Sequence, residues 1–187
     1  MAERQTFELF NAGHMVHVAK AKTITAVLER GLLSPIELGK LRSRELPEGT
    51  IWHPFENRLV KFRALERNSN GEKRRELLNH FSTFGRYDSD DIDTWPIGYI
   101  VPRNSEAIRM WEGESYFGIE TRVSVKEIVG IVFALPPVLL RQKSYLEITR
   151  NRVLVEKVNS AVKEAMAQGL LDSPYPLVDH FGRHLQL

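Results

Sequence analysis

The chain has 187 residues and a mass of 21.5 kDa, enough for one compact domain with a sizeable core. Lys and Arg outnumber Asp and Glu by 26 to 24, a formal net charge of +2, so the chain lacks the basic excess of a purely electrostatic nucleic-acid binder. The absence of cysteine excludes a disulfide framework, thiol catalysis and Cys-ligated zinc or iron–sulfur sites.

Hydropathy argues against a membrane protein. The longest apolar run, residues 128–140, is broken by Gly130 and by Pro136-Pro137 and is shorter than a membrane-spanning helix. The N-terminal stretch MAERQTFELF lacks the apolar segment of a secretory signal peptide. We therefore expect a soluble, cytoplasmic protein without a membrane partner. A substrate of a dedicated secretion machine would share these features.

The first third of the chain predicts a strand followed by two helices. Residues 15–18 are β-prone, and residues 22–32 repeat their apolar positions at helical spacing. Thr23 is the expected N-cap of that helix, and Gly31 stands where a helix ends in a left-handed residue. A second, shorter helix is expected over residues 36–46.

The middle of the chain predicts mostly strands after a long irregular stretch. Residues 47–75 are interpreted as irregular to helical and basic. Residues 97–102 predict a strand, and Asn104 is expected to cap a short helix that ends at Trp111. Two strands rich in β-branched and aromatic residues are expected over 116–124 and 128–135.

The C-terminal part predicts one amphipathic helix over residues 153–168, closed by Gly169 and followed by a loop. Its apolar stripe suits packing on the chain's own sheet. Pairing with a partner, as in a scaffold or regulatory protein, is the alternative. The apolar stripe consists of Val155, Val158, Val162, Ala165 and Met166.

These elements predict an α+β fold with its strands concentrated after residue 95. We expect one domain over residues 1–187, with a core at about 7–135 and a C-terminal helical segment at 145–187.

Charge is segregated along the chain. Residues 40–75 contain ten Lys or Arg and five Glu, a net charge of +5. Residues 76–130 contain ten Asp or Glu and five Lys or Arg, a net charge of −5. A basic arm beside an acidic site and two solvated faces of one domain explain this pattern equally well.

The common catalytic and metal-binding motifs are absent. The chain has no zinc-protease helix motif, no EF-hand loop, no Walker A loop, no dinucleotide-binding glycine fingerprint and no nucleophile elbow. His14 and His17 are three residues apart, but on a strand this spacing sends them to opposite faces. We therefore expect no metal site.

An arrangement of single residues along the chain is more informative. His17 lies on the first expected strand, and Leu32 of the helix-closing Gly31-Leu32 pair follows fifteen residues later. Tyr99 lies on a middle strand, and Glu120 is interpreted as the start of a late strand. This order resembles the ADP-ribosyltransferase superfamily of the His-Tyr-Glu type, which includes the poly(ADP-ribose) polymerases. It is closest to the DarT-like DNA ADP-ribosyltransferase toxins.

The resemblance spans roughly residues 9–135 and depends on the order of four segments, none of which is specific alone. They are HVAKAKTITAVLERGLLSPIEL (17–38), IWHPFENRL (51–59), GYIVPRNSEAI (98–108) and IETRVSVKEIVGIVF (119–133).

The resemblance implies a split antiparallel sheet core with peripheral helices, and NAD as co-substrate. It implies that the Glu120 carboxylate stabilises the oxocarbenium-like transition state while the bond to nicotinamide breaks. Glu114 and Glu127 are the alternatives to Glu120, and Glu127 is expected in the turn after the strand. The alternative for each of these residues is an ordinary structural role.

The resemblance also implies the residues that bind NAD. His17 would hydrogen-bond a ribose hydroxyl, Tyr99 would stack on the nicotinamide ring, and the backbone of Val18 would hold the carboxamide. Arg58, in preference to Arg103, would pair with the diphosphate. Trp52, Trp95 and Trp111 are expected in the core or in an interface.

The sequence departs from the family pattern at two places. Ala19 stands where the family has Ser or Thr, and the stretch from Tyr99 to Glu120 is short. These departures leave open a catalytically inactive nucleotide- or nucleic-acid-binding module on the same fold. The identity of the acceptor (DNA, RNA or protein) stays open as well. So does the choice between transfer of ADP-ribose and hydrolysis of NAD. An antitoxin or a protein target are the other partners that the resemblance implies.

Overall fold

A computed structural model describes residues 13–41, 58–65, 72–84, 91–104, 106–110, 116–134 and 145–185. The strands are β1 (His14–Lys20), β2 (Leu32–Leu33), β3 (Leu59–Ala64), β4 (Pro96–Pro102), β5 (Ile108–Arg109), β6 (Tyr116–Glu120), β7 (Arg122–Val123), β8 (Gly130–Phe133) and β9 (Leu177–Asp179). The α-helices are α1 (Ile24–Arg30), α2 (Pro35–Leu41), α3 (Glu72–Phe84) and α4 (Tyr145–Ala167), and three 3₁₀ turns are η1 (Ala21–Thr23), η4 (Ile92–Thr94) and η5 (Val125–Glu127).

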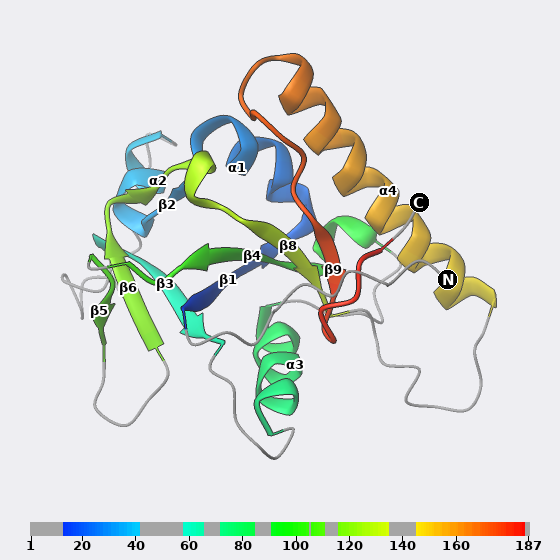
Figure 1. Cartoon of the computed structure of the whole chain (residues 1–187), viewed down its shortest axis with the longest axis horizontal. Helices are drawn as coiled ribbons and strands as arrows, with labels where there is room; N and C mark the ends of the chain where they lie inside the picture. The colour runs from blue at the N-terminus through cyan, green and yellow to red at the C-terminus, as the bar shows by residue number, and fades with distance from the viewer. Residues whose placement is uncertain are drawn as a thin grey trace.

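Seven strands form one sheet in the order β5-β6-β3-β1-β4-β8-β9, and β2 and β7 form a separate two-stranded sheet. All pairs are antiparallel except β8 with β9. The fold is therefore α+β with a large, mostly antiparallel sheet, as the sequence predicted (Figure 1).

The strand β1 pairs with its two neighbours in the sheet over different lengths. β1 pairs with β4 over its whole length, from His14 opposite Pro102 to Lys20 opposite Pro96. On its other side β1 pairs with β3 only at Met15 and Val16. The sheet therefore opens between β1 and β3 just before His17.

Each face of the sheet buries a different layer. Side chains alternate between faces along a strand, so Met15, Ile97 and Tyr99 pack toward α1 and α4, while Val16 and Val18 pack toward α3. Figure 1 shows α1 and α4 side by side on one face and α3 on the other. The stripe of α4 is buried here, since Val158 and Val162 are 0% and 2% exposed. It packs on the chain's own core.

Gly31 closes α1 as predicted, with φ of +80°. Its ψ of −171° puts it outside the left-handed helical region that the sequence indicated. The close approach of β7 adds a second reason for glycine. A Cβ at position 31 would lie 2.1 Å from the carbonyl oxygen of Val123.

Several predicted elements are confirmed with shifted bounds. The strands at 15–18, 97–102 and 128–135 are β1, β4 and β8. The strand over 116–124 is divided into β6 and β7 at Thr121, and α4 begins earlier than expected, at Tyr145. Trp95 is a core residue, 1% exposed. Trp52 and Trp111 lie outside the described residues, as does the end of the predicted helix beyond Leu41.

Three predictions were wrong. Residues 59–64 form the strand β3 in the middle of the sheet, where an irregular to helical segment was expected. Asn104 caps no helix: its side chain accepts a hydrogen bond from the backbone of Glu106 in a turn, and β5 follows. The tail is not all loop, because β9 pairs with β8. Six of the nine described strands nevertheless lie after residue 95, as the sequence predicted.

In the described part of the chain, no helix is long and apolar enough to cross a membrane.

Candidate functional site

A small, largely apolar pocket opens between β1, α1 and α2. Its cavity volume is about 230 Å³, below the ~300–1,000 Å³ typical of sites for whole ligands, so it suits one part of a larger ligand. Leu38 and Leu41 of its rim are exposed apolar side chains, 37% and 53% accessible. This histidine pocket is lined by His17, Ala19, Thr23, Ala26, Val27, Arg30, Gly31, Leu32, Leu33, Leu38 and Leu41.

His17 occupies the opening between β1 and β3. Its Nδ1 atom lies 2.9 Å from the carbonyl oxygen of Lys61, and its ring meets Phe62 edge-on at 5.8 Å. Because a carbonyl can only accept, Nδ1 carries the proton and the Nε2 of the neutral ring is an acceptor. Burial lowers the pKa of His17, partly offset by the hydrogen bond to Lys61, so the ring is neutral at pH 7.

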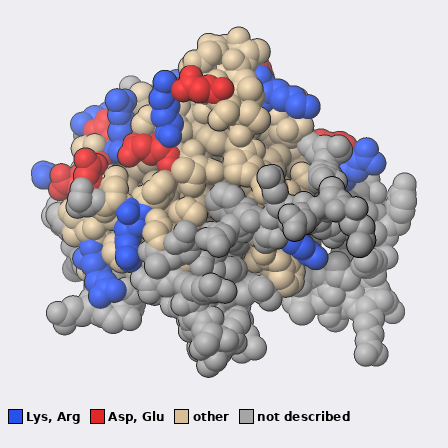
Figure 2. Space-filling view, in the orientation of Figure 1, with Lys and Arg blue, Asp and Glu red and all other residues tan. Residues whose placement is uncertain are grey.

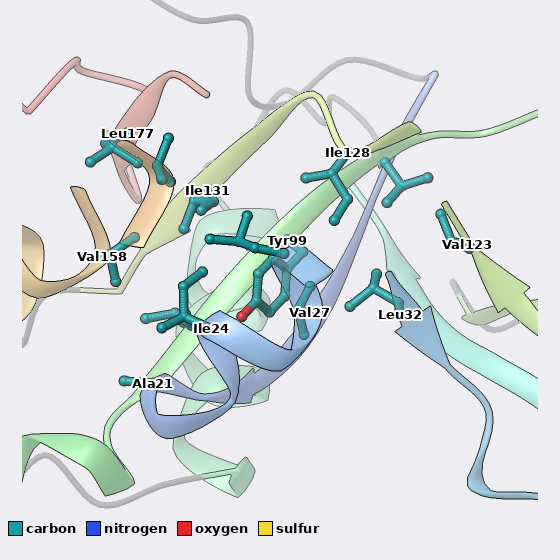
Figure 3. Packing of buried hydrophobic residues seen from close by; sticks show 14 of the residues in the cluster. Ala21, Ile24, Val27, Leu32, Tyr99, Val123, Ile128, Ile131, Val158 and Leu177 are labelled. Atoms are coloured by element: carbon teal, nitrogen blue, oxygen red, sulfur yellow. The ribbon is translucent and has the colours of Figure 1, made fainter. Parts of the chain in front are cut away.

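Tyr99 lies directly opposite His17 on β4, but it is not among the residues that line the histidine pocket. Its side chain is fully buried and lies beneath α1 beside Ile24 and Val27 (Figure 3). The phenol hydroxyl is buried, and no partner among the described residues meets hydrogen-bond geometry, although the Thr23 hydroxyl is near enough to act against the effect of burial on the tyrosine pKa. The nearby Thr23 hydroxyl donates instead to the carbonyl of Lys20, at 2.8 Å. Burial raises the pKa of Tyr99 above its ordinary value.

A second, more polar pocket lies at the other side of the β2–α2 segment. Its cavity volume is about 360 Å³. Glu37 pairs with Lys40 at 2.6 Å, and in the described part of the chain neither Glu120 nor Arg58 belongs to an ion pair. This glutamate pocket is lined by Ser34, Ile36, Glu37, Lys40, Arg58, Glu120 and Thr121.

His17 and Glu120 do not share a pocket. Phe117 pairs with Phe62, whose ring touches His17, so Phe117 and His17 share a face of the sheet. Glu120 is three residues further on and points to the other face. It is also the last residue of β6, where the sequence interpretation placed it at a strand start. Neither the histidine pocket nor the glutamate pocket is lined by His17, Tyr99 and Glu120 together.

The remaining predicted site residues lie in the two pockets, in the core and on the exposed surface. Ala19 lines the histidine pocket, and Arg58, which is exposed, lines the glutamate pocket. Val18 lines neither, and its side chain is 2% exposed in the layer under α3. Arg103 is exposed and stacks over the Phe117 ring at 5.1 Å.

The two alternatives to Glu120 have different positions. Glu127 lies in the turn after the strand, as expected, and its carboxylate accepts a hydrogen bond from the backbone of Ser124 at 2.7 Å. That bond belongs to a capping box, which is a structural role. Glu114 lies outside the described residues.

The sequence reasoning missed the other polar side chains that line the pockets: Ser34, Thr23, Arg30, Glu37, Lys40 and Thr121. Ser34 precedes α2 with Glu37 three residues later, and its hydroxyl accepts from the Glu37 backbone at 3.4 Å. The Ser-x-x-Glu spacing is a recognisable helix start and could have placed this corner. For Thr23, the N-cap of α1, and for Arg30, its last residue, the available signal was only their place beside the pocket.

Charge is mixed on the face of the molecule that Figure 2 shows. Figure 2 shows Lys and Arg interleaved with Asp and Glu, without a continuous patch of one sign on this face. Of the predicted basic segment 40–75, side chains are described at Lys40, Arg58, Lys61 and Arg63. No group of three or more His, Asp or Glu that could hold a metal ion occurs among the described residues.

A scan against protein-family models finds no matching family, and searches of curated proteins and of solved structures find no similar protein.

Proposed function

We propose that the chain is an NAD-dependent ADP-ribosyltransferase that binds the dinucleotide across the two pockets, on either side of the β2–α2 segment. The observation that carries the proposal is the placement of a neutral imidazole in one pocket and of a carboxylate and a guanidinium in the next. The two cavities measure about 230 and 360 Å³, and residues of the segment 32–41 line both.

The histidine pocket suits the nicotinamide ring and its ribose. Its walls are apolar, and the Nε2 of His17 accepts a hydrogen bond from a ribose hydroxyl because Nδ1 is held by Lys61. Thr23 offers a second polar group there, in the pocket where Ala19 lacks the hydroxyl of the family pattern. Tyr99 has no part in stacking in this proposal, because its ring is buried beneath α1.

The glutamate pocket suits the charged part of the reaction. When the bond from C1′ to nicotinamide breaks, its electron pair leaves with nicotinamide and positive charge develops on the ribose. The proposal requires this ribose to extend from the histidine pocket past the β2–α2 segment to the glutamate pocket. There the Glu120 carboxylate stabilises the charge, and Arg58 pairs with the diphosphate. The acceptor's nucleophilic atom then forms the new bond to C1′ and gives its proton to Glu120 or to water.

The proposal is tested with NAD labelled in its adenylate half. The chain is incubated with single-stranded DNA, RNA or a protein extract, and nicotinamide release and label transfer are followed. Transfer to one acceptor class supports the proposal and identifies the acceptor. Nicotinamide release without transfer indicates NAD hydrolysis. If no nicotinamide is released with any acceptor, the proposal is wrong.

A second candidate is a non-catalytic module that binds a nucleotide. The separation of His17 and Glu120 on opposite faces of the sheet favours it, because a catalytic carboxylate must reach the ribose that His17 holds. Saturable NAD binding without nicotinamide release selects this candidate.

A further inference from the structure

Thr121 has a backbone conformation that its side chain disfavours. In the described part of the chain it is the only residue other than glycine with a positive φ, +61°. β-Branched residues are rare outliers there because Cβ crowds the backbone. The other positive-φ positions, Gly31, Gly169 and Gly182, are all glycine.

The backbone at Thr121 is needed for the fold, and the side chain is not. The chain changes partner here, from β3 along β6 to β2 along β7. The Thr121 N–H donates to the carbonyl of Arg58 at 2.8 Å, and its own carbonyl accepts from the N–H of Ser34 at 2.9 Å. Glycine would make both bonds without the strain.

The strained side chain stands in the glutamate pocket. Thr121 is exposed and lines this pocket beside Glu120 and Arg58. A hydroxyl that donates and accepts, a carboxylate that accepts and a guanidinium that only donates are thus combined in one cavity. Strained residues gather at ligand sites, where the side chain serves binding.

We propose that the Thr121 hydroxyl contacts the ligand of the glutamate pocket, and that this ligand is a phosphorylated sugar. Sugar hydroxyls donate to Glu120, a phosphate oxygen accepts from Arg58, and Thr121 hydrogen-bonds the sugar between them. This inference rests on the proposed function, because NAD and ADP-ribose both contain a phosphorylated sugar.

Three substitutions separate the hydroxyl from the strain. Thr121→Gly removes both, Thr121→Val keeps the β-branched shape without the hydroxyl, and Thr121→Ser keeps the hydroxyl. Binding of ADP-ribose and of ribose 5-phosphate is measured by calorimetry, and the melting temperature by thermal unfolding. We expect about three- to tenfold weaker binding for the Gly and Val variants, the effect of one hydrogen bond. Thr121→Ser keeps the affinity, and Thr121→Gly keeps or raises the melting temperature.

Three results would overturn the inference: no binding of ADP-ribose by the unchanged chain, unchanged affinity in Thr121→Gly, or unchanged affinity in Thr121→Val. Its failure differs from that of the proposed function. If the unchanged chain releases nicotinamide and Thr121→Gly keeps the full affinity for ADP-ribose, only this inference is wrong. If Thr121→Gly binds ADP-ribose more weakly but the unchanged chain releases no nicotinamide, only the enzymatic proposal is wrong.

Discussion

The imidazole of His17 donates from Nδ1 to the carbonyl of Lys61, 2.9 Å away, where the pairing of β1 with β3 has just ended. A side chain thus satisfies a strand carbonyl beside the opening in the sheet. The same bond orients the ring and leaves Nε2 as its acceptor. His17 therefore has a structural role in the sheet besides the ligand contact proposed for it.

Substitution of His17 should separate these two roles. His17→Ala removes the exposed hydrogen bond to the Lys61 carbonyl and should lower the free energy of unfolding by about 0.5–1.5 kcal/mol. His17→Asn places an amide N–H near the Nδ1 position and should recover part of that loss, without restoring NAD affinity. Urea unfolding and NAD titration measure the two effects. Equal stability of the Ala variant and the unchanged chain would contradict the structural role.

Stability should fall on the acid side because of His80. Burial, with smaller contributions from Arg63 and His17, lowers its pKa from 6.5 to about 4. Below pH 6.5 the unfolded chain therefore binds a proton that the folded chain excludes. The stabilisation is intact above pH 6.5 and is lost as the pH falls toward 4, by at most about 3 kcal/mol.

His80→Gln should flatten this pH dependence, measured as unfolding free energy between pH 7 and 4. His184→Gln, at an exposed histidine, controls for the loss of a histidine as such. The assignment to His80 is wrong if both variants keep the slope of the unchanged chain.

The two glycines that end helices should differ in their tolerance of alanine. A Cβ added at Gly169, where φ is +72°, would meet no atom of the described residues within 4 Å, so Gly169→Ala should cost only the backbone strain, about 1 kcal/mol. Gly31→Ala adds the clash with the Val123 carbonyl and should cost at least about 1 kcal/mol more. Thermal unfolding compares the two. Equal losses would mean that β7 moves away without cost.

Tyr99→Phe should leave the protein as stable or raise its free energy of unfolding by about 1 kcal/mol, because it removes a buried hydroxyl that has no partner among the described residues. NAD turnover should not change, since the ring lies beneath α1 and lines neither pocket. A loss of stability would show that the hydroxyl is bonded, and a loss of turnover would restore Tyr99 to the site.

Local patterns predicted the elements that have a strong period or a clear end. α1 with Gly31, β4 and the stripe of α4 followed from apolar spacing and terminal glycine. β3 was missed although its apolar positions alternate, because Lys61 and Arg63 were read as part of a basic segment. They are the polar face of a strand. β9 has three residues and pairs in parallel with β8, which local sequence does not reveal.

The candidate site depended on strand register, which the sequence does not specify. The sequence placed His17, Tyr99 and Glu120 on strands, and each lies on a strand. The face on which each points is set by pairing, and the pairing of Phe62 with Phe117 puts Glu120 on the face opposite His17. Thr121, which bends the chain at this corner, has no sequence signal because threonine rarely adopts a positive φ.

The most direct test of the enzymatic account is nicotinamide release from NAD by Glu120→Gln, compared with Glu106→Gln at an exposed position outside both pockets. With folding of both variants verified, the account predicts a loss of at least ~10²-fold in kcat for Glu120→Gln and no change for Glu106→Gln. Undiminished turnover in Glu120→Gln would contradict it.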